Sequence, residues 1–376
     1  MLLTMESKTA AYHKLETLIE RGRTTASNVV DYVMNNQPND RLAQAGQMDF
    51  QLDSDSGQLL VSYPDQYATS GRLVQRLHRN ALSQIADTAN LSMKFVDSLQ
   101  NGTGRWGTEL LAHNLNMIFR NRFSKQRHLL RSLGQEVRGF LSNKYRRLDS
   151  RPIVEAFATA VQKKGAMPYN GYVTDTKIAI QAIMPEVYEP IPGELVAYGI
   201  SLENSDFGNG ALSLRAYLLR IWCSNLAITE EEMRQIHLGK RLDESMLYSN
   251  RTYELDAKAT VSALRDVIES TFDSDSLKRR MDSIREANEQ ALEPQQAKET
   301  LRRLLQKGEL DAAAQAFESQ DTYNLPAGNT KWRLSNAISW IAGQTKDEER
   351  KLDLMKIAGE VLPSSALRYK SKSQAA

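Results

Sequence analysis

Residues 120–151 read RNRFSKQRHLLRSLGQEVRGFLSNKYRRLDSR, and they contain the clearest fold signal of the chain. Residues 128–133 and 137–142 have a two-residue period, which is typical of β-strands, and the intervening LGQE has the composition of a tight turn. This stretch therefore predicts a β-hairpin. Asp149 or Ser150 is placed to cap a following helix that carries Pro152 in its first turn.

Helices and turn-bounded strands surround this hairpin in mixed order. Before it, the pattern predicts a helix over 1–35, short strands at 48–52 and 58–63, and helices over 70–123, of which the last covers 108–123. After it we expect a helix over 150–164, strands at 171–173, 177–184 and 195–203, and a glycine-rich loop at 204–210 that leads to residues 211–228. Residues 229–320 and 330–362 are expected to form amphipathic helices, with Trp332 and Trp340 close to one face.

These elements predict an α+β protein. A central mixed domain, in which antiparallel hairpin strands pack with helices, is followed by a helical C-terminal region. We place an N-terminal helix with a hairpin or linker at 1–69, the central domain with the basic hairpin at 70–228, and the helical region with a disordered tail at 229–376. A chain of 376 residues is long enough for two or three compact units.

The composition is that of an ordinary soluble protein from a reducing compartment. Hydrophobic residues make up 41% of the chain, charged residues make up 25%, and no run approaches the 18 or so apolar residues that span a bilayer. Cys223 is the single cysteine, so no intramolecular disulfide can form. The N-terminus has neither the basic start nor the apolar run of a signal peptide. We therefore expect the cytoplasm of a host cell and no contact with a membrane.

The hairpin segment also concentrates positive charge. Residues 120–151 hold ten Lys or Arg and two acidic residues, a local net charge of +8, whereas the whole chain carries +2. The rest of the chain is therefore net acidic, and the cations are gathered in one stretch that also contains Phe123, Phe140 and Tyr145. Clustered Lys and Arg neutralise phosphates, and interleaved aromatic rings can stack on unpaired bases, which is typical of nucleic-acid binding.

Twelve residues of this stretch form the expected nucleic-acid interface. They are Arg120, Arg122, Lys125, Arg127, Arg131, Arg138, Phe140, Lys144, Tyr145, Arg146, Arg147 and Arg151. Of these, we expect Arg138, Lys144, Arg146 and Arg147 to contact phosphates and Phe140 or Tyr145 to stack on bases. The competing interpretation is a solvated surface on which Arg side chains cover apolar neighbours.

GTGRWG, Gly102–Gly107, matches the glycine pattern of dinucleotide-binding loops letter for letter. That motif needs a strand before the glycines, and the preceding LSMKFVDSLQN has a helical pattern. We therefore expect a connector between two helices. The weaker alternative is one phosphate bound by the amides at the start of the second helix.

No catalytic residue, metal ion or cofactor is predicted. The five histidines are scattered, Cys223 lies among apolar residues as a buried and inert thiol, and the loop 204–210 is without the closing glutamate of a calcium site. Serine-hydrolase and P-loop signatures are absent from the sequence. We expect a protein that is not an enzyme. A catalytic interpretation would require four carboxylates to converge in one cleft, namely Asp149, Asp175, Glu203 and Asp206.

Three blocks of the chain resemble a phage/plasmid-like protein family of unknown function. LLRSLGQEVRGFLSNKYRRLDS (residues 129–150) is similar to its pattern R…(R/G)-x-F-L-S-x-x-Y-x-x-L-D. ISLENSDFGNGALSLRAYLLRIWCSNLAI (200–228) resembles its N-S-E-x-G-x-G-A-L…R-x-x-C-x-N-G block, and TKWRLSNAISWIAG (330–343) resembles its W-x-x-x-N-A-x-T helix. Leu226 and Ser339 depart from these patterns, at positions where Gly and Thr are common.

The resemblance covers roughly residues 70–360 and implies a protein of phages, prophages or plasmids, often encoded near antirestriction genes. It implies no established activity. With the basic segment, it leads us to expect a non-catalytic nucleic-acid-binding protein of phage or plasmid DNA metabolism. The concrete form we expect is single-stranded DNA binding or annealing in recombination by a homo-oligomer. The alternative is a counter-defence or protein-interaction module that binds a host factor.

Overall fold

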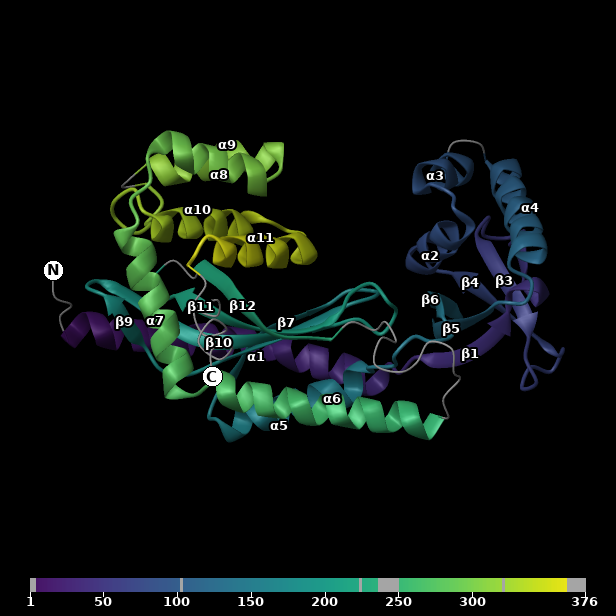
Figure 1. Ribbon diagram of the computed structural model, residues 1–376, viewed down its shortest axis with the longest axis horizontal. Helices are drawn as coiled ribbons and strands as arrows, with labels where there is room; N and C mark the ends of the chain where they lie inside the picture. The colour runs from purple at the N-terminus through teal and green to yellow at the C-terminus, as the bar shows by residue number, and fades with distance from the viewer. Residues whose placement is uncertain (1–4, 102–103, 223–224, 236–249, 320–321, 364–376) are drawn as a thin grey trace, which may run out of the picture.

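The computed structural model describes residues 5–101, 104–222, 225–235, 250–319 and 322–363, and it confirms the predicted α+β class. The helices are α1 (Met5–Asn35), α2 (Arg79–Ala89), α3 (Met93–Asn101), α4 (Arg105–Arg122), α5 (Ser150–Lys163), α6 (Asn250–Thr271), α7 (Ser274–Glu289), α8 (Pro294–Leu304), α9 (Lys307–Glu318), α10 (Lys331–Gln344) and α11 (Glu348–Glu360). The strands are β1 (Asn39–Gln44), β2 (Asp49–Leu52), β3 (Leu59–Pro64), β4 (Arg72–Leu77), β5 (Arg127–Leu133), β6 (Glu136–Ser142), β7 (Met167–Val173), β8 (Ile178–Ile183), β9 (Tyr188–Ile191), β10 (Glu194–Asn204), β11 (Leu212–Arg220) and β12 (Asn225–Gln235). The strands form two sheets, which lie in two lobes (Figure 1).

The smaller lobe, residues 39–142, is a six-stranded sheet with helices on one face (Figure 1). Its strand order is β1-β5-β6-β4-β3-β2, and neighbouring strands are antiparallel except for β4 and β6. Helices α2, α3 and α4 bury their apolar sides against this sheet. Phe119 of α4 meets Phe50 and Phe140 edge to face, with ring centroids 5.3 and 5.7 Å apart. Such ring pairs stabilise a core beyond the area that they bury.

The predicted hairpin of the basic segment is confirmed as β5 and β6. Gly134 lies in the turn with a φ of 59°, a left-handed conformation that glycine adopts at low cost. The cross-strand pair Leu130 and Phe140 faces the helices, whereas Leu129 and Leu141 pair on the opposite face. Both faces of the hairpin are therefore buried over much of their length.

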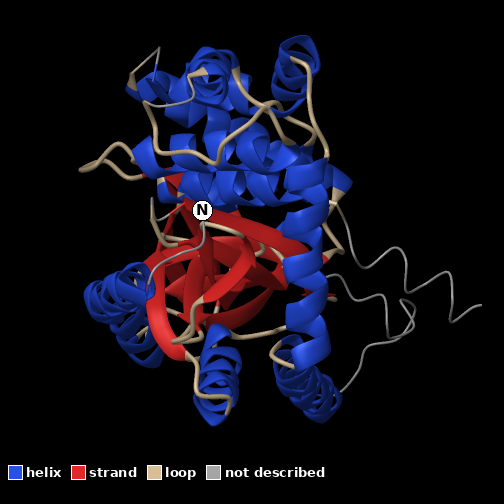
Figure 2. Ribbon diagram, turned by 90° about the vertical axis from the view of Figure 1, so that its left-hand side faces the viewer, coloured by secondary structure: helices blue, strands red, loops and turns tan. Residues whose placement is uncertain are grey.

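The larger lobe is a sheet between two layers of helices (Figure 2). Its strands run in the order β12-β11-β10-β8-β7, β9 pairs with β10, and each described pair is antiparallel. Ile180, Ile200 and Leu214 share a core with α5 and α6. Ala179 and Tyr217 belong to the core that α10 and α11 complete. The two helical layers thus cover opposite faces of one sheet.

Helix α1 lies along β7, at an edge of the larger sheet. A Cβ on Gly22 would lie 1.4 Å from the carbonyl oxygen of Tyr169, and a Cβ on Gly171 would lie 2.6 Å from Cγ2 of Val29. Glycine at both positions therefore allows the helix and the strand to approach backbone to backbone. The predicted N-terminal helix is confirmed, and it covers a sheet edge that could otherwise pair with another chain.

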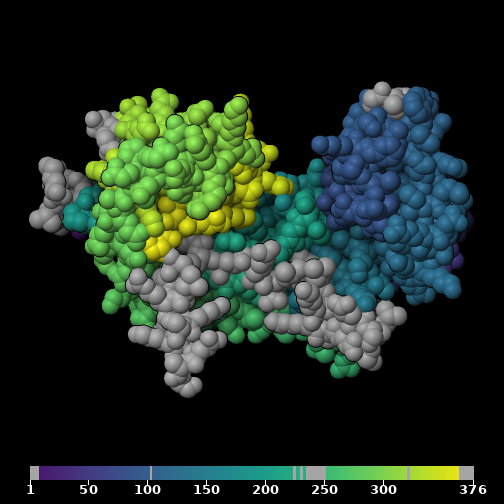
Figure 3. Space-filling model, turned by 45° about the horizontal axis from the view of Figure 1, so that its top comes forward, coloured from purple at the N-terminus to yellow at the C-terminus, as the bar shows by residue number. Residues whose placement is uncertain are grey.

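The two lobes meet at the loop between β10 and β11. The carbonyl oxygen of Phe207 accepts hydrogen bonds from Asn80 Nδ2 at 3.0 Å and from Gln84 Nε2 at 2.9 Å, both on α2. The hydroxyl of Tyr145 donates to the carbonyl oxygen of Ser205 at 3.2 Å. Beside this junction the surface is hollowed between α2–α3 and the C-terminal helices (Figure 3).

Residues 72–77, predicted to be helical, form strand β4. Leu73 and Leu77 are four residues apart and fit a helical stripe, but they equally fit a two-residue period with Gln75 between them. The neighbouring strand decides between the two interpretations, because β4 pairs with β3 through Leu73 opposite Tyr63. Strands β2 and β3, in contrast, lie within a residue or two of their predicted positions.

Residues 229–235, TEEEMRQ, continue β12 and do not start the predicted helix. β12 lies at the edge of its sheet, and its Glu232 forms an ion pair with Arg280 of α7. Its Met233 is opposite Leu214 and is buried. The helices predicted from residue 250 onward are present as α6 to α11. Residues 236–249, also predicted to be helical, and the predicted disordered tail lie outside the described residues.

The structure also groups the chain differently from the predicted boundaries at 69/70 and 228/229. Strands β1–β3 pair into one sheet with β4–β6, so the first boundary divides a single lobe. Helix α1 packs on β7 of the larger lobe, and the second boundary lies inside β12. The predicted boundaries follow changes in composition along the chain. The lobes are instead defined by which strands share a sheet, and composition does not show this pairing.

His128 is a buried ring of the smaller lobe, and its burial predicts a loss of stability in acid. It stacks on Phe140 with centroids 4.3 Å apart, and its Nε2 is buried without a hydrogen-bond partner. Burial lowers the pKa of His128 to about 4, from an ordinary value of 6.5. Stability from the neutral ring is therefore complete above pH 6.5 and is lost as the pH falls toward 4.

The substitution His128→Phe keeps an aromatic ring on Phe140 and removes the titrating group. Between pH 7 and pH 5 we expect the parent protein to lose about 1–2 kcal/mol more unfolding free energy than the variant. Urea unfolding at pH 7, 6 and 5 measures the difference. Equal losses in the two proteins would mean that His128 does not control the acid sensitivity.

Candidate nucleic-acid interface

Arg131, predicted to belong to the nucleic-acid interface, is the most buried cation of the basic segment. Its side chain is 1% exposed; its Nε lies 2.8 Å from Asp40 Oδ1, and one terminal nitrogen lies 2.5 Å from Asp149 Oδ1. The other terminal nitrogen donates to the carbonyl oxygen of Asp206 at 2.8 Å. The guanidinium thus joins β1, the start of α5 and the β10–β11 loop, and it is not available to a phosphate.

Asp206 caps α5 from another segment of the chain. Its Oδ1 accepts hydrogen bonds from the backbone nitrogen of Ser150 at 2.8 Å and from Ser150 Oγ at 2.9 Å. Asp149 holds the N-cap position, as predicted, but its side chain makes no capping hydrogen bond and turns to Arg131. Burial raises the pKa of Asp206 to about 6, so this carboxylate takes up a proton more readily than a surface aspartate.

Arg146 and Arg147, expected to contact phosphates, bind carboxylates of the protein itself. Arg146 is 4% exposed; it lies 2.6 Å from Asp256 Oδ2 and donates to Thr260 Oγ1 at 3.2 Å, both on α6. Arg147 Nε lies 2.6 Å from Asp40 Oδ2. These ion pairs tie the turn after β6 to α6 and to β1, so the two residues hold the structure together.

Three further cations of the segment have a carboxylate partner. They are Arg120 with Asp49 at 2.7 Å, Arg138 with Glu136 at 3.0 Å, and Arg151 with Glu155 at 3.1 Å. The first and third pairs are exposed and contribute little stability. Arg138 is largely buried and also donates to the carbonyl oxygen of Asp175 at 2.9 Å, so it bridges the two lobes.

The two aromatic rings expected to stack on bases are internal. Phe140 is 3% exposed and is sandwiched in the core between Phe119 and His128. Tyr145 is 6% exposed and packs with Leu129 and Leu141. The base-stacking prediction is therefore wrong for this conformation, because neither ring presents a face to solvent.

Four cations stay exposed and lie at one end of the hairpin. They are Arg122, Lys125, Arg127 and Lys144, and we name this set the basic edge. Because β5 and β6 are antiparallel, with His128 opposite Ser142, the start of β5 and the turn after β6 lie side by side. Among the described residues, none of the four lies within ion-pair distance of a carboxylate; Arg122 stacks over Phe123 at 5.2 Å.

The glycine motif at 102–107 lies between two helices, as expected. Helix α3 ends at Asn101 and α4 begins at Arg105, inside the motif, with Gly104 at the N-cap position in a positive-φ conformation of 69°. A dinucleotide loop would need a strand in place of α3. Gly102 and Thr103 lie outside the described residues, so the weaker single-phosphate alternative stays a prediction.

The carboxylates that a catalytic interpretation would require do not converge in one cleft. Asp149 and Asp206 meet at Arg131, whereas Glu203 lies under α11 and binds Lys356. Asp175 is exposed at the lobe junction. Within the described ranges, no group of His, Cys, Asp and Glu side chains has the geometry of a metal site. Cys223, predicted to be a buried thiol, lies outside the described residues.

Three comparisons with known proteins found no match for the chain: no protein-family model, no curated protein and no solved structure matches it. The resemblance to the phage/plasmid-like family therefore stays a prediction. Among the described helices, none combines the length and the apolar composition that crossing a bilayer requires.

Arg146 and Arg151 belong to the same basic segment but differ in burial, and this difference predicts their roles in stability. Arg146→Ala leaves the largely buried Asp256 carboxylate uncompensated, so we expect a loss of about 3–5 kcal/mol in unfolding free energy. Arg151→Ala removes an exposed pair with Glu155 and should cost less than about 1 kcal/mol. Urea unfolding of both variants gives the comparison, and similar losses would contradict the structural role of Arg146.

Proposed function

We propose that the protein binds nucleic acid through the basic edge. The observation that carries this proposal is the exposure of Arg122, Lys125, Arg127 and Lys144 at one end of the hairpin, without ion-pair partners among the described residues. Clustered cations that the protein does not neutralise attract a phosphate backbone and release its counterions on binding. A non-enzymatic role is part of the same proposal.

The proposed interface is narrower than the one that the sequence predicts. Six of the ten cations of residues 120–151 bind carboxylates of the chain, and Phe140 and Tyr145 are buried. Because both rings are buried, base stacking no longer favours single-stranded over double-stranded nucleic acid. Phosphate contact alone supports the proposal. Annealing in recombination would further require a preference for single strands and an oligomeric assembly, and both are measurable.

Removal of the basic edge should weaken oligonucleotide binding and its dependence on salt. The variant carries Arg122→Ala, Lys125→Ala, Arg127→Ala and Lys144→Ala, all at exposed positions. If four phosphate contacts are lost, the slope of log K against log salt should fall by about 3, since each contact contributes roughly 0.7–0.9. Fluorescence anisotropy with single- and double-stranded DNA over a salt series measures affinity, slope and strand preference together.

A matched control removes four exposed cations from the C-terminal helices. It carries Lys278→Ala, Arg302→Ala, Arg303→Ala and Lys307→Ala, so the net charge changes equally. We expect this control to bind much as the parent does. Equal loss in both variants would indicate a general charge effect, and no affinity in the parent at low salt would end the proposal.

A second candidate function, interaction with another protein, is favoured by one face of α4. Trp106, Leu110 and Met117 are 59%, 40% and 50% exposed, and their spacing of four and seven residues places them on one side of the helix. Large apolar side chains that line up on a surface typically mark a contact with another molecule. The first partner to test is a second copy of this chain, since a homo-oligomer is part of the expected function.

Sedimentation velocity over a range of protein concentrations tests this second candidate. If a second copy covers α4, the parent should self-associate as its concentration rises, whereas a Trp106→Ser/Met117→Ser variant should stay monomeric. Leu255→Ser, at a 56% exposed position on α6, is the matched control and should behave as the parent does. A parent that stays monomeric throughout would exclude a second copy as the partner.

A further inference from the structure

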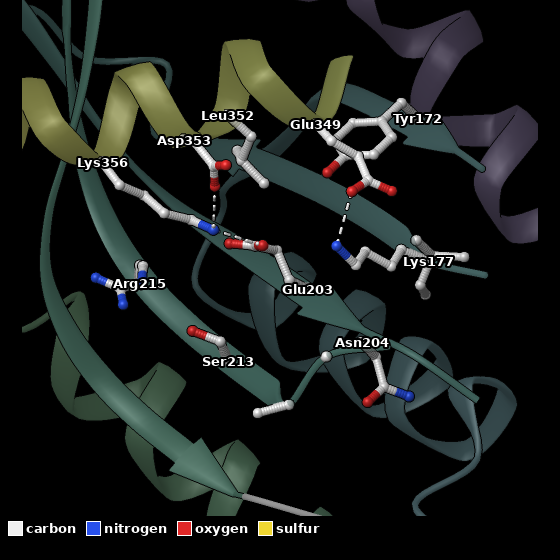
Figure 4. Close-up of a pocket in the computed structure, with 13 residues that line it drawn as sticks. Tyr172, Lys177, Glu203, Asn204, Ser213, Arg215, Glu349, Leu352, Asp353 and Lys356 are labelled. Atoms are coloured by element: carbon white, nitrogen blue, oxygen red, sulfur yellow. Dashed lines mark hydrogen bonds and ion pairs between the residues drawn. The ribbon is translucent and has the colours of Figure 1, made fainter. Parts of the chain in front are cut away.

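A pocket of about 200 Å³ lies between the larger sheet and helix α11 (Figure 4). Its floor comes from the ends of β8, β10 and β11. Its roof comes from Glu349, Leu352, Asp353 and Lys356, which follow an i, i+3, i+4, i+7 pattern and therefore share one face of α11. Two segments about 150 residues apart in sequence thus enclose the space, as the bond from Lys356 to Glu203 illustrates.

Charged groups of both signs line the pocket in equal number. They are Lys177, Arg215 and Lys356, and Glu203, Glu349 and Asp353. Lys177 Nζ lies 2.7 Å from Glu349 Oε2, and Lys356 Nζ lies 2.8 Å from Glu203 Oε2. Each of these ion pairs joins the floor to the roof. The walls are electroneutral as a whole, while positive and negative groups stay close to the same space.

Three polar atoms on this face of the sheet are buried without a hydrogen-bond partner. They are Gln181 Oε1 on β8, and Ser201 Oγ and Glu203 Oε1 on β10. Ser201 pairs with Gln181 in register and Glu203 follows two residues later, so the three side chains lie on one face. A buried polar atom without a partner costs about 1–3 kcal/mol, and such atoms are rare in folded proteins. This row of three leaves hydrogen-bonding capacity on this face of the sheet for water or a small ligand.

Glu203 is the member of this row that lines the pocket directly. One of its oxygens binds Lys356, and the other needs a donor. A buried carboxylate oxygen without a hydrogen-bond donor favours a cationic donor, because charge-assisted hydrogen bonds are roughly twice as strong as neutral ones. At the opposite wall, burial together with the nearby carboxylates of Glu203 and Glu349 raises the pKa of Tyr172, so its hydroxyl stays neutral and can donate.

We propose that the pocket binds a small zwitterion of the amino-acid class, with its ammonium group on Glu203 and its carboxylate toward Arg215. Figure 4 shows Lys356 and Glu203 pointing toward each other, and Arg215 on β11 lines the same pocket. A zwitterion matches walls that carry both signs, whereas a ligand of one sign meets repulsion from half of them. The volume lies below the roughly 300–1,000 Å³ of sites for drug-sized ligands, so a compact molecule is favoured. This site is separate from the basic edge and does not depend on nucleic-acid binding.

Isothermal titration calorimetry of the full-length protein tests the ligand class. The probes are L-alanine, L-serine, L-glutamate and L-arginine, each compared with its N-acetyl derivative, which has no ammonium group, and with its methyl ester, which has no α-carboxylate. At least one free amino acid should bind at least ten times more tightly than both of its derivatives. An ester that binds as tightly as the free acid would overturn the zwitterion in favour of a simple ammonium. Binding of no probe, as expected for a pocket that holds water only, would overturn the proposal.

Two variants locate the site. Glu203→Gln keeps the shape and removes the charge, so affinity should fall at least tenfold; Glu299→Gln, exposed on α8, is the matched control and should bind as the parent does. Gly210→Leu fills the pocket from its rim, where a Cβ would lie 3.7 Å from Lys177 Cε and from Ser205 Cβ and so meets no clash. If Glu203→Gln fails to fold, the affinity of Gly210→Leu still shows whether the ligand binds in this pocket. Unchanged affinity in either folded variant would place the ligand elsewhere.

Discussion

The buried guanidinium of Arg131 is the interaction on which the junction of the two lobes depends. It binds Asp40 of β1, Asp149 at the start of α5 and the carbonyl oxygen of Asp206 in the β10–β11 loop. A buried cation with two carboxylates is costly to break, because the loss of one partner leaves charge uncompensated in the interior. The ion pairs therefore fix the hairpin β5–β6 against the larger lobe. They also fix where the two ends of the hairpin point, and one of those ends carries the basic edge.

Local features of the fold were predictable from the sequence, and long-range ones were not. The hairpin, the N-cap position of Asp149 and the C-terminal helices follow from short periodic patterns. Residues 72–77 fit two periods at once, so only pairing with β3 decides that they form a strand. The partners of the basic segment could not be predicted, because Asp40 and Asp256 lie 91 and 110 residues away from Arg131 and Arg146. No local pattern connects such positions.

Charge density in a sequence does not distinguish a binding surface from an internal network of ion pairs. The basic segment has a net charge of +8 in a chain of +2, so the remaining residues supply an excess of carboxylates. Some of those carboxylates fold back onto the segment, and burial then decides which cations stay available. Burial likewise decides whether an aromatic ring is available to a ligand, and Phe140 lies in a strand whose two faces are both buried. What remains for a polyanion is the part of the segment that leaves the hairpin at its open end.

The face of β10 toward α11 changes from apolar to polar along the strand. Leu195 and Ala197 begin that face as part of an apolar core, and Ser201 and Glu203 end it. A face kept only for packing would stay apolar, since buried polar atoms without partners destabilise the fold. Ion pairs kept only to attach α11 would satisfy both oxygens of Glu203, yet Lys356 satisfies one. In the sequence, polar residues alternate with apolar ones in ISLEN, residues 200–204. This alternation is consistent with polar side chains on one face of β10 that bind the proposed ligand.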